Sequence, residues 1–333
     1  MTSKSTFLVA AICAAPLSIA ACGGSSDGAI TPAGPHHGYV VSSVSIPTSD
    51  KQATDFGLDL GSKTASKQDG MVDNKLGEAL SALAALNFNI QGTVNTAVDQ
   101  GSLILLIDLQ TKDFASSDGA GFSVKIGATP MPAPCNGSSD TVCRHHLDGT
   151  GMFTVAASSP TDAAVAGKIA SGTFNGGPGD VTLQLAIGST TPIELSLLHA
   201  RVKATSITDA GMTAIVGGLV TQAELTNSIG PAIQVQVAGI LDRDCPVAAG
   251  ATRTPPMCGC KASSTGATVV AALDGDLTMG ADKDCVISTA EVLGFPLVAQ
   301  LLLPDSCSTD SCKTPDSISI GIKAQAVKAT FPM

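Results

Sequence analysis

The chain has 333 residues, with 28 acidic side chains against 18 lysines and arginines and a formal net charge of −10 at pH 7. An acidic surface repels nucleic acid, because nucleic-acid binders present a basic surface to the phosphates. We therefore expect no nucleic-acid partner. Aromatic residues make up 3% of the chain, with no Trp and one Tyr, which argues against a carbohydrate-binding surface built from aromatic platforms.

A short apolar segment opens the chain. Lys4 is the only charged side chain before Cys22, and residues 7–21 are mostly apolar. This segment is shorter than the roughly 20 apolar residues of a membrane-spanning helix, and with its basic start it is typical of a signal peptide. Its ending, Ser18-Ile-Ala-Ala-Cys22, resembles the lipobox of bacterial lipoproteins. The resemblance implies that residues 1–21 are removed and that Cys22 is diacylated and becomes the new N-terminus.

The following residues favour the same interpretation. Residues 22–38 hold the lipidated cysteine and a spacer rich in Gly, Ser and Pro, which is typical of a flexible tether. Two acyl chains anchor a protein stably to a membrane, and Gly23 implies the outer membrane by the sorting rule of enteric lipoproteins. We expect a lipid-anchored body that faces either the periplasm or the cell surface. The alternative is an ordinary secretory signal in which Cys22 is incidental.

Eight cysteines follow Cys22, which is an even number. They are Cys135, Cys143, Cys245, Cys258, Cys260, Cys285, Cys307 and Cys312. An exported protein lives in an oxidising compartment, so four disulfides are expected. Short spacing favours the pairs Cys135–Cys143 and Cys307–Cys312 and leaves the other four to pair among themselves. The alternative is a zinc site, but only one residue separates Cys258 from Cys260 and no His lies nearby, whereas zinc motifs usually have two to four intervening residues.

Alternating apolar residues predict half-buried antiparallel strands, and the almost continuously apolar run 103–109 predicts a strand buried on both faces. The expected strands lie at 41–46, 103–109, 122–126, 181–187, 193–204 and 318–326. The alternation slips at Leu198, which indicates a β-bulge or bend. Helical spacing and capping residues predict three helices. They lie at 75–88, 221–237 and 288–303. Asp73 or Asn74 would cap the first helix, and Pro231 should kink or divide the second.

Many short strands with Gly- and Pro-rich turns favour a mainly β protein, an antiparallel β-sandwich with a few helices. We expect the sandwich domain at 39–244. A disulfide-rich insertion should follow at 245–316, and the C-terminal strand at 317–333 should return to the sandwich.

One loop resembles a calcium-binding EF-hand. It runs from Gly280 to Glu291 as GADKDCVISTAE. The resemblance implies that a calcium ion would be held by Asp282, Asp284, the carbonyl of Val286, Ser288 and Glu291. Two positions depart from the pattern, because Gly280 replaces the first Asp and Cys285 replaces the turn glycine; Asp274 or Asp276 could supply the missing oxygen. The alternative is that Ser288 and Glu291 form a helix-capping box and that the aspartates are turn residues.

Other polar groups have simpler interpretations. An acidic cluster before the first helix reads as a solvated turn with an N-cap, or as a second cation site; its members are Asp55, Asp59, Asp69, Asp73 and Asn74. His36 and His37 lie in the spacer. His145, His146 and Asp148 could serve in metal binding or acid–base chemistry, although adjacent residues of a strand point to opposite faces. His199 is expected to be packed or at the surface. The glycine-rich stretch 174–179 precedes a strand rather than a helix, so we interpret it as a turn and not as a phosphate cradle.

No nucleophile elbow, HExxH zinc motif or P-loop occurs in the sequence, and we expect no enzyme activity. The preferred hypothesis is a lipid-anchored cell-envelope protein that acts as a binding or structural surface module, with calcium as its one expected cofactor. Its protein or small-molecule partner is unspecified. One alternative is a carrier of apolar ligands, which needs an apolar cavity. Another is a secreted hydrolase without a recognisable motif, which needs a histidine beside acids from distant strands.

Overall fold

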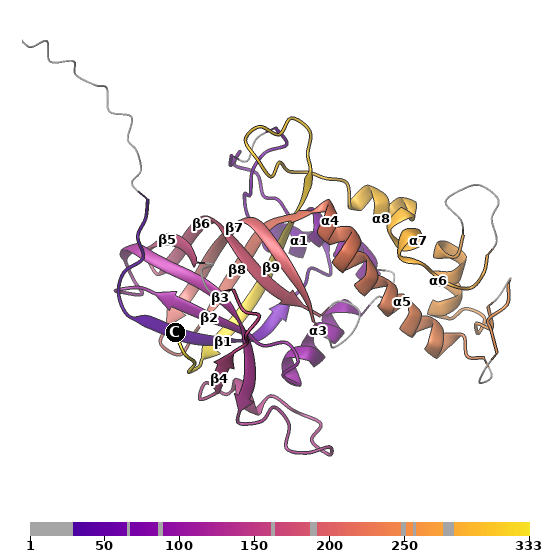
Figure 1. The fold of residues 1–333 in the computed structure, drawn as a ribbon, viewed down its shortest axis with the longest axis horizontal. Coiled ribbons are helices and arrows are strands. Elements are labelled where there is room, and N and C mark those ends of the chain that lie inside the picture. The colour runs from indigo at the N-terminus through magenta and orange to yellow at the C-terminus, as the bar shows by residue number, and fades with distance from the viewer. Residues whose placement is uncertain are drawn as a thin grey trace, which may run out of the picture.

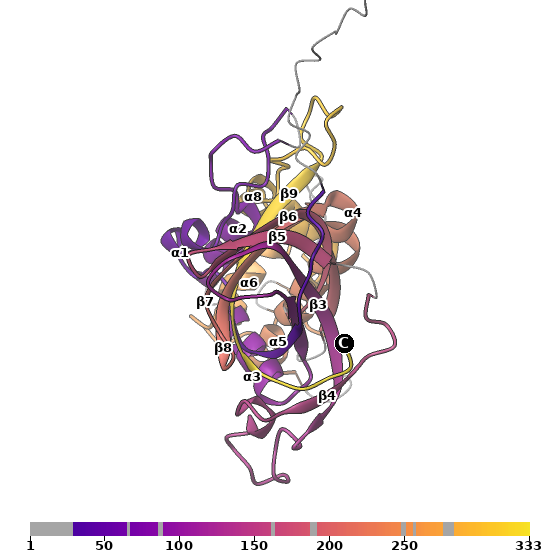
Figure 2. The same cartoon turned by 90° about the vertical axis from the view of Figure 1, so that its left-hand side faces the viewer.

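The computed structural model describes residues 29–64, 67–85, 89–160, 164–186, 192–247, 251–255, 258–275 and 283–333. Eight antiparallel strands form a closed barrel, in the circular order β1-β9-β8-β7-β6-β5-β3-β2 (Figures 1 and 2). The strands are β1 (His36–Ser45), β2 (Leu105–Gln110), β3 (Ser117–Met131), β5 (Ala164–Ala170), β6 (Thr173–Leu185), β7 (Ile193–Thr208), β8 (Gly211–Thr221) and β9 (Ser317–Lys328). A further short strand, β4 (Met152–Val155), pairs with β3 outside the ring.

The predicted sandwich is therefore wrong. β2 pairs with β1 on one side and with β3 on the other, so the sheet has no open edge at this point: Asp108 lies opposite both Gly38 and Ser123. Sandwiches and barrels share the alternation of buried and exposed side chains. The two folds differ in whether the sheet closes on itself, and that depends on pairing between strands far apart in the chain.

Side chains fill the interior of the barrel. The rings of Phe122 on β3 and Phe174 on β6 stack across β5, with centroids 5.8 Å apart, and both side chains are fully buried. Tyr39 reaches along the interior and donates a hydrogen bond from its hydroxyl to the carbonyl of Thr208 at 2.9 Å. An eight-stranded barrel is just wide enough for its own side chains to occupy the lumen. The inside of the ring is therefore one part of the core, and the same buried cluster continues into the helices outside the barrel through residues such as Leu80, Val94 and Val237.

Several local signals in the sequence are confirmed. The alternation slip in β7 is a bulge, with a register shift between Leu198 and Arg201. Asn74 caps α2 (Lys75–Ala85) by accepting from Gly77 N, and its amide also bonds the backbone of Gly321 in β9. The stretch 174–179 is not a turn: it lies within β6, which bulges between Gly176 and Gly179.

The helices lie outside the barrel. α1 (Asp50–Asp55) and α2 pack together, α2 contacts β9, and α3 (Ile90–Asp99) contacts β1. After β8 the chain forms α4 (Gln222–Glu224), a π-helical turn (Leu225–Ile229) and α5 (Gly230–Asp244), so Pro231 stands at the start of a new helix, as predicted. α5 packs against α6 (Thr265–Leu273) and α7 (Thr289–Gly294), and α8 (Pro296–Leu301) follows (Figure 1).

Four disulfides are present. The two pairs expected from spacing, Cys135–Cys143 and Cys307–Cys312, are confirmed. The remaining cysteines form Cys245–Cys260 and Cys258–Cys285. These two bonds connect the end of α5, the loop before α6 and the loop before α7. They therefore crosslink a helical region that lies beside the barrel.

Candidate functional site

The proposed anchor, Cys22, lies outside the described residues. The described chain begins with exposed Ala29 and then runs along the barrel, where Ala33 N donates to the carbonyl of Gly119 at 3.3 Å. Strand β1 begins at His36, inside the range predicted as a flexible tether, and His36 Nδ1 lies 2.9 Å from the buried carboxylate of Asp108. The last residues of the predicted spacer, 36–38, belong to β1 and pair with β2.

The described part of the EF-hand-like loop uses its polar groups on its own backbone. Asp284 Oδ1 accepts a hydrogen bond from Val286 N at 2.8 Å. Ser288 Oγ accepts from Glu291 N at 3.2 Å, and Glu291 Oε2 accepts from Ser288 N at 2.6 Å. These last two bonds form the capping box that begins α7. Asp282 lies outside the described residues, as does Asp276.

Asp274 lies at the centre of this region. Asp274 is 2% exposed, and its carboxylate accepts hydrogen bonds from the backbone N–H groups of Asp284 and Cys285. Burial raises the pKa of Asp274, and the nearby charges of Asp284 and Glu291 raise it further. Glu291 also accepts from Gly275 N at 3.2 Å. The acids therefore come near one another, but each is hydrogen-bonded to backbone.

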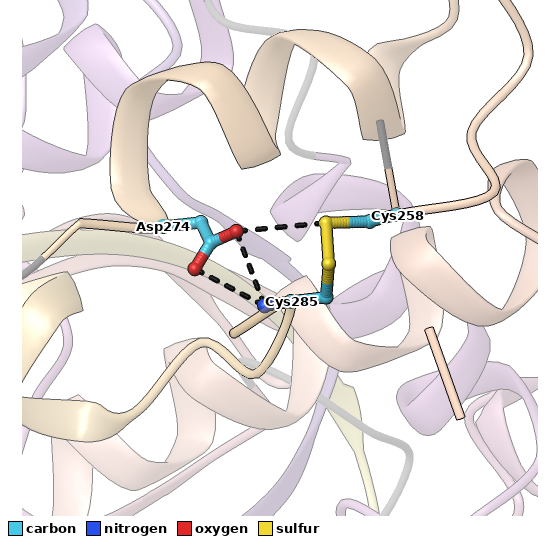
Figure 3. A group of neighbouring side chains, drawn as sticks. All are labelled: Cys258, Asp274 and Cys285. Atoms are coloured by element: carbon cyan, nitrogen blue, oxygen red, sulfur yellow. Dashed lines mark hydrogen bonds between the residues drawn. A yellow bond between two sulfur atoms is a disulfide. The ribbon is translucent and has the colours of Figure 1, made fainter. Parts of the chain in front are cut away.

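The disulfide Cys258–Cys285 lies directly against Asp274 (Figure 3). Cys258 Sγ and Asp274 Oδ2 are 3.5 Å apart, which is a close contact, because a disulfide sulfur has no proton to donate. Within the described ranges, these three residues are the one group of His, Cys, Asp or Glu ligand atoms that lie within 4.8 Å of one another. Metal binding by cysteine requires thiolates. With both sulfurs in a disulfide, this group does not fit a metal. Asp284 and Glu291, the acids of the EF-hand-like loop that the structure describes, do not belong to such a group.

The predicted histidine site divides into separate environments. His145 Nε2 is 2.8 Å from Asp140 Oδ2 and 3.0 Å from Asn136 Nδ2, in a loop closed by the Cys135–Cys143 disulfide. Hydrogen bonds from backbone N–H groups of this loop, led by that of Asn136, hold the pKa of Asp140 well below its usual range. The loop borders a cavity of about 350 Å³ that His145 and Asp148 help to line. All these residues come from one loop and not from distant strands.

His146 and His199 lie in environments that differ from that of His145. His146 is buried with its ring edge-on to Phe153, and burial, aided by the charge of Arg144, lowers the pKa of His146 to about 4. It is therefore neutral at physiological pH. His199 is half-buried at the β7 bulge, where its φ is 51°. The carboxylate of Asp148 accepts hydrogen bonds from the N–H and hydroxyl of Thr150 and not from a histidine.

The acidic cluster before the first helix is also divided. Asp59 accepts hydrogen bonds from the N–H groups of Asp69 and Gly70, which shapes the loop. Asp73 accepts from Leu60 N at 2.8 Å, and Asn74 is the α2 cap described above. The N-cap part of the first interpretation is therefore confirmed.

Sequence reasoning missed a polar groove on the outer face of β5, β6 and β7. Arg201 and Lys203 lie on it, and their spacing of two places them on the same face of β7. That pattern was available in the sequence. The loop that closes the groove, which carries Leu58, Asp59 and Gln68, could not be located without the fold.

Comparisons with protein-family models, curated proteins and solved structures find no match. Within the described residues, every helix is too short or too polar to cross a lipid bilayer.

Proposed function

We propose that this protein is an exported cell-envelope lipoprotein, anchored through Cys22, whose barrel acts as a binding module. The observation that carries the proposal is the pairing of all eight cysteines that follow Cys22 into four disulfides. Disulfides form and persist in oxidising compartments. The lipobox resemblance supplies the route to that compartment and the means of attachment to the outer membrane.

The interior of the barrel favours a binding surface over a carrier of apolar ligands. A carrier needs an apolar cavity, whereas the interior here is occupied by side chains such as Phe122, Phe174 and Tyr39. The hydrolase alternative has less support, because the hydrogen-bond partners of His145 in the described part of the chain, Asp140 and Asn136, come from its own loop. We therefore place function on the outer surface and infer a non-catalytic role.

The anchor is tested by substituting Cys22 and, as a control, Cys13 of the predicted signal peptide. The full-length protein is expressed in a Gram-negative host with a metabolic fatty-acid label, and the membrane fraction is analysed by intact mass spectrometry. We expect a diacylated N-terminal Cys22 and loss of both label and membrane retention in Cys22→Ser. Cys13→Ser is the matched control, because it removes a thiol from the predicted signal peptide and should leave lipidation unchanged. Membrane retention of Cys22→Ser without label would refute the proposal.

Calcium binding remains a prediction for the loop at 280–291. What favours it is the mutual proximity of acids around Asp274, whose charges a cation would neutralise. The melting temperature in millimolar calcium, compared with EGTA and with magnesium, tests it directly. A rise that Asp284→Asn abolishes would support a site; an unchanged melting temperature would rule it out.

A further inference from the structure

A small groove of about 230 Å³, with polar and apolar residues in its lining, lies on the outside of the barrel. Its floor is formed by β5, β6 and β7, and the loop that carries Leu58, Asp59 and Gln68 closes one side. Asn175, Arg201 and Lys203 line it from the strands, so two cations and one acid face a common space. The groove is separate from the disulfide-linked region around Asp274 and from the His145 loop.

The strand geometry explains how Arg201 reaches this position. β7 resumes its regular pairing at Arg201 after the bulge, where Arg201 lies opposite Gly217 and buried Val202 lies opposite Val216. Arg201 and Lys203 therefore share the outward face of the strand. On the neighbouring strand, Gly177 has a φ of 110°, and a Cβ there would lie 2.5 Å from the carbonyl oxygen of Ala200 and 3.0 Å from Arg201 Cγ. A glycine at 177 leaves the space that the arginine stem occupies.

The guanidinium of Arg201 is incompletely satisfied. Its Nε is buried and has no hydrogen-bond partner among the residues the structure describes. Buried polar atoms in folded proteins nearly always have a partner, and an arginine stays protonated. Asp59 is the acid whose charge acts on Arg201, but both oxygens of its carboxylate accept hydrogen bonds from Asp69 N and Gly70 N. Arg201 thus lines the groove, and its unpaired Nε lies beneath the surface of its guanidinium group.

We propose that this groove binds a small anion, a carboxylate or a phosphoryl group, through the guanidinium of Arg201, with Lys203 as the second cation. The planar fork of arginine matches the oxygens of both groups and holds them by two parallel hydrogen bonds. The groove is smaller than the about 300–1,000 Å³ of most pockets for drug-sized ligands. It therefore suits a small anion or the charged end of a larger molecule, with Asn175 available for further polar contacts, whereas Gln68 Nε2 donates to the carbonyl of Asp59 at 3.1 Å.

This proposal names a class of ligand, small anions, for the binding role proposed above. It rests on that proposed function in one respect, namely that the barrel acts as a binding module. The groove belongs to the barrel and not to the tether. The experiment on Cys22 measures lipidation, whereas the NMR experiment below measures anion binding. Either result can therefore be negative while the other is positive.

The test follows the Nε–H of Arg201 by NMR. Isotope-labelled full-length protein is titrated with inorganic phosphate and, separately, with acetate, at ionic strength held constant with sodium chloride. We expect a saturable shift of the Arg201 Nε–H signal and of the amides around Asn175. Saturation by phosphate alone identifies a phosphoryl ligand, and saturation by acetate alone identifies a carboxylate.

Variants separate specific binding from general charge. Arg201→Gln should weaken binding about tenfold or more, because charge-assisted hydrogen bonds are lost, and Lys203→Gln about threefold. Arg201→Lys keeps the charge without the fork and should fall between the parent and Arg201→Gln. Lys168→Gln is the control, since Lys168 is exposed on β5 but does not line the groove. The proposal is overturned if neither anion gives a saturable shift, or if folded Arg201→Gln, judged by its amide spectrum, binds as tightly as the parent.

Discussion

Asp73 makes the stability of this protein depend on pH in a direction opposite to that of a salt-bridged carboxylate. Burial raises the pKa of Asp73 to about 6, and the charges of Asp305 and Asp69 add to the effect, while hydrogen bonding from Leu60 N opposes it. An unfolded aspartate has a pKa near 3.8. Between these values the folded state binds more protons than the unfolded state. Stability therefore falls as the pH rises through this window.

The size of the effect follows from the shift. About two pKa units correspond to at most about 3 kcal/mol, and partial solvent access reduces this to about 1–2 kcal/mol. Asp73→Asn removes the charge, while the amide oxygen can still accept from Leu60 N. We expect the variant to be about 1–2 kcal/mol more stable than the parent at neutral pH. The two proteins should differ little near pH 4, where Asp73 is protonated.

The measurement is urea denaturation followed by far-UV circular dichroism, at several values from about pH 4 to about pH 7, the window of the Asp73 titration. Asp118→Asn is the matched control, because Asp118 is an exposed aspartate of β3. It should leave the pH profile unchanged. A profile for Asp73→Asn that parallels the parent, or a lower stability than the parent at neutral pH, would show that burial and repulsion at Asp73 do not govern this window.

Three further predictions concern stability. Phe174→Ala should lower the free energy of unfolding by about 3–5 kcal/mol, because the ring of Phe174 fills the barrel beside Phe122. Phe114→Ala removes a half-buried ring and should lower it clearly less. Equal losses of stability in chemical denaturation would contradict a filled barrel interior. Replacing both Cys258 and Cys285 by Ala should cost about 3–4 kcal/mol, since the bond closes a loop with a sequence separation of 27; an unchanged denaturation midpoint would argue against it. Ser288→Ala should lower the free energy of unfolding by about 1 kcal/mol, because it removes the N-cap of α7. Calorimetry measures the loss, and Thr289→Ala, at the residue next to the cap, is the control variant.

Features set by one or two residues could be predicted from the sequence. Asn74 caps α2, Pro231 stands at the start of α5, and the slip at Leu198 is a bulge, because capping, ring geometry and alternation are local properties. The closure of the barrel could not be predicted. It depends on β2 pairing with both β1 and β3, and the alternation of buried residues is the same in an open sheet and in a closed one.

The candidate sites show a similar division. Asp284, Ser288 and Glu291 match an EF-hand by type and spacing, yet the same residue types also accept hydrogen bonds from backbone N–H groups at turns and helix starts. Sequence spacing alone does not separate the two roles. The groove at Arg201 depends on a loop from the first quarter of the chain lying over strands from its middle, and no local pattern records that contact.

Ile30 is part of the lining of this groove and lies close in the sequence to the proposed anchor, Cys22. Ile30 lies eight positions after Cys22, and eight extended residues reach at most about 29 Å. A lipid on Cys22 would therefore hold the opening of the groove within that distance of the bilayer surface. Ligands would then be drawn from the thin layer of solution next to the membrane, where the phosphates of lipid headgroups are themselves among the available anions.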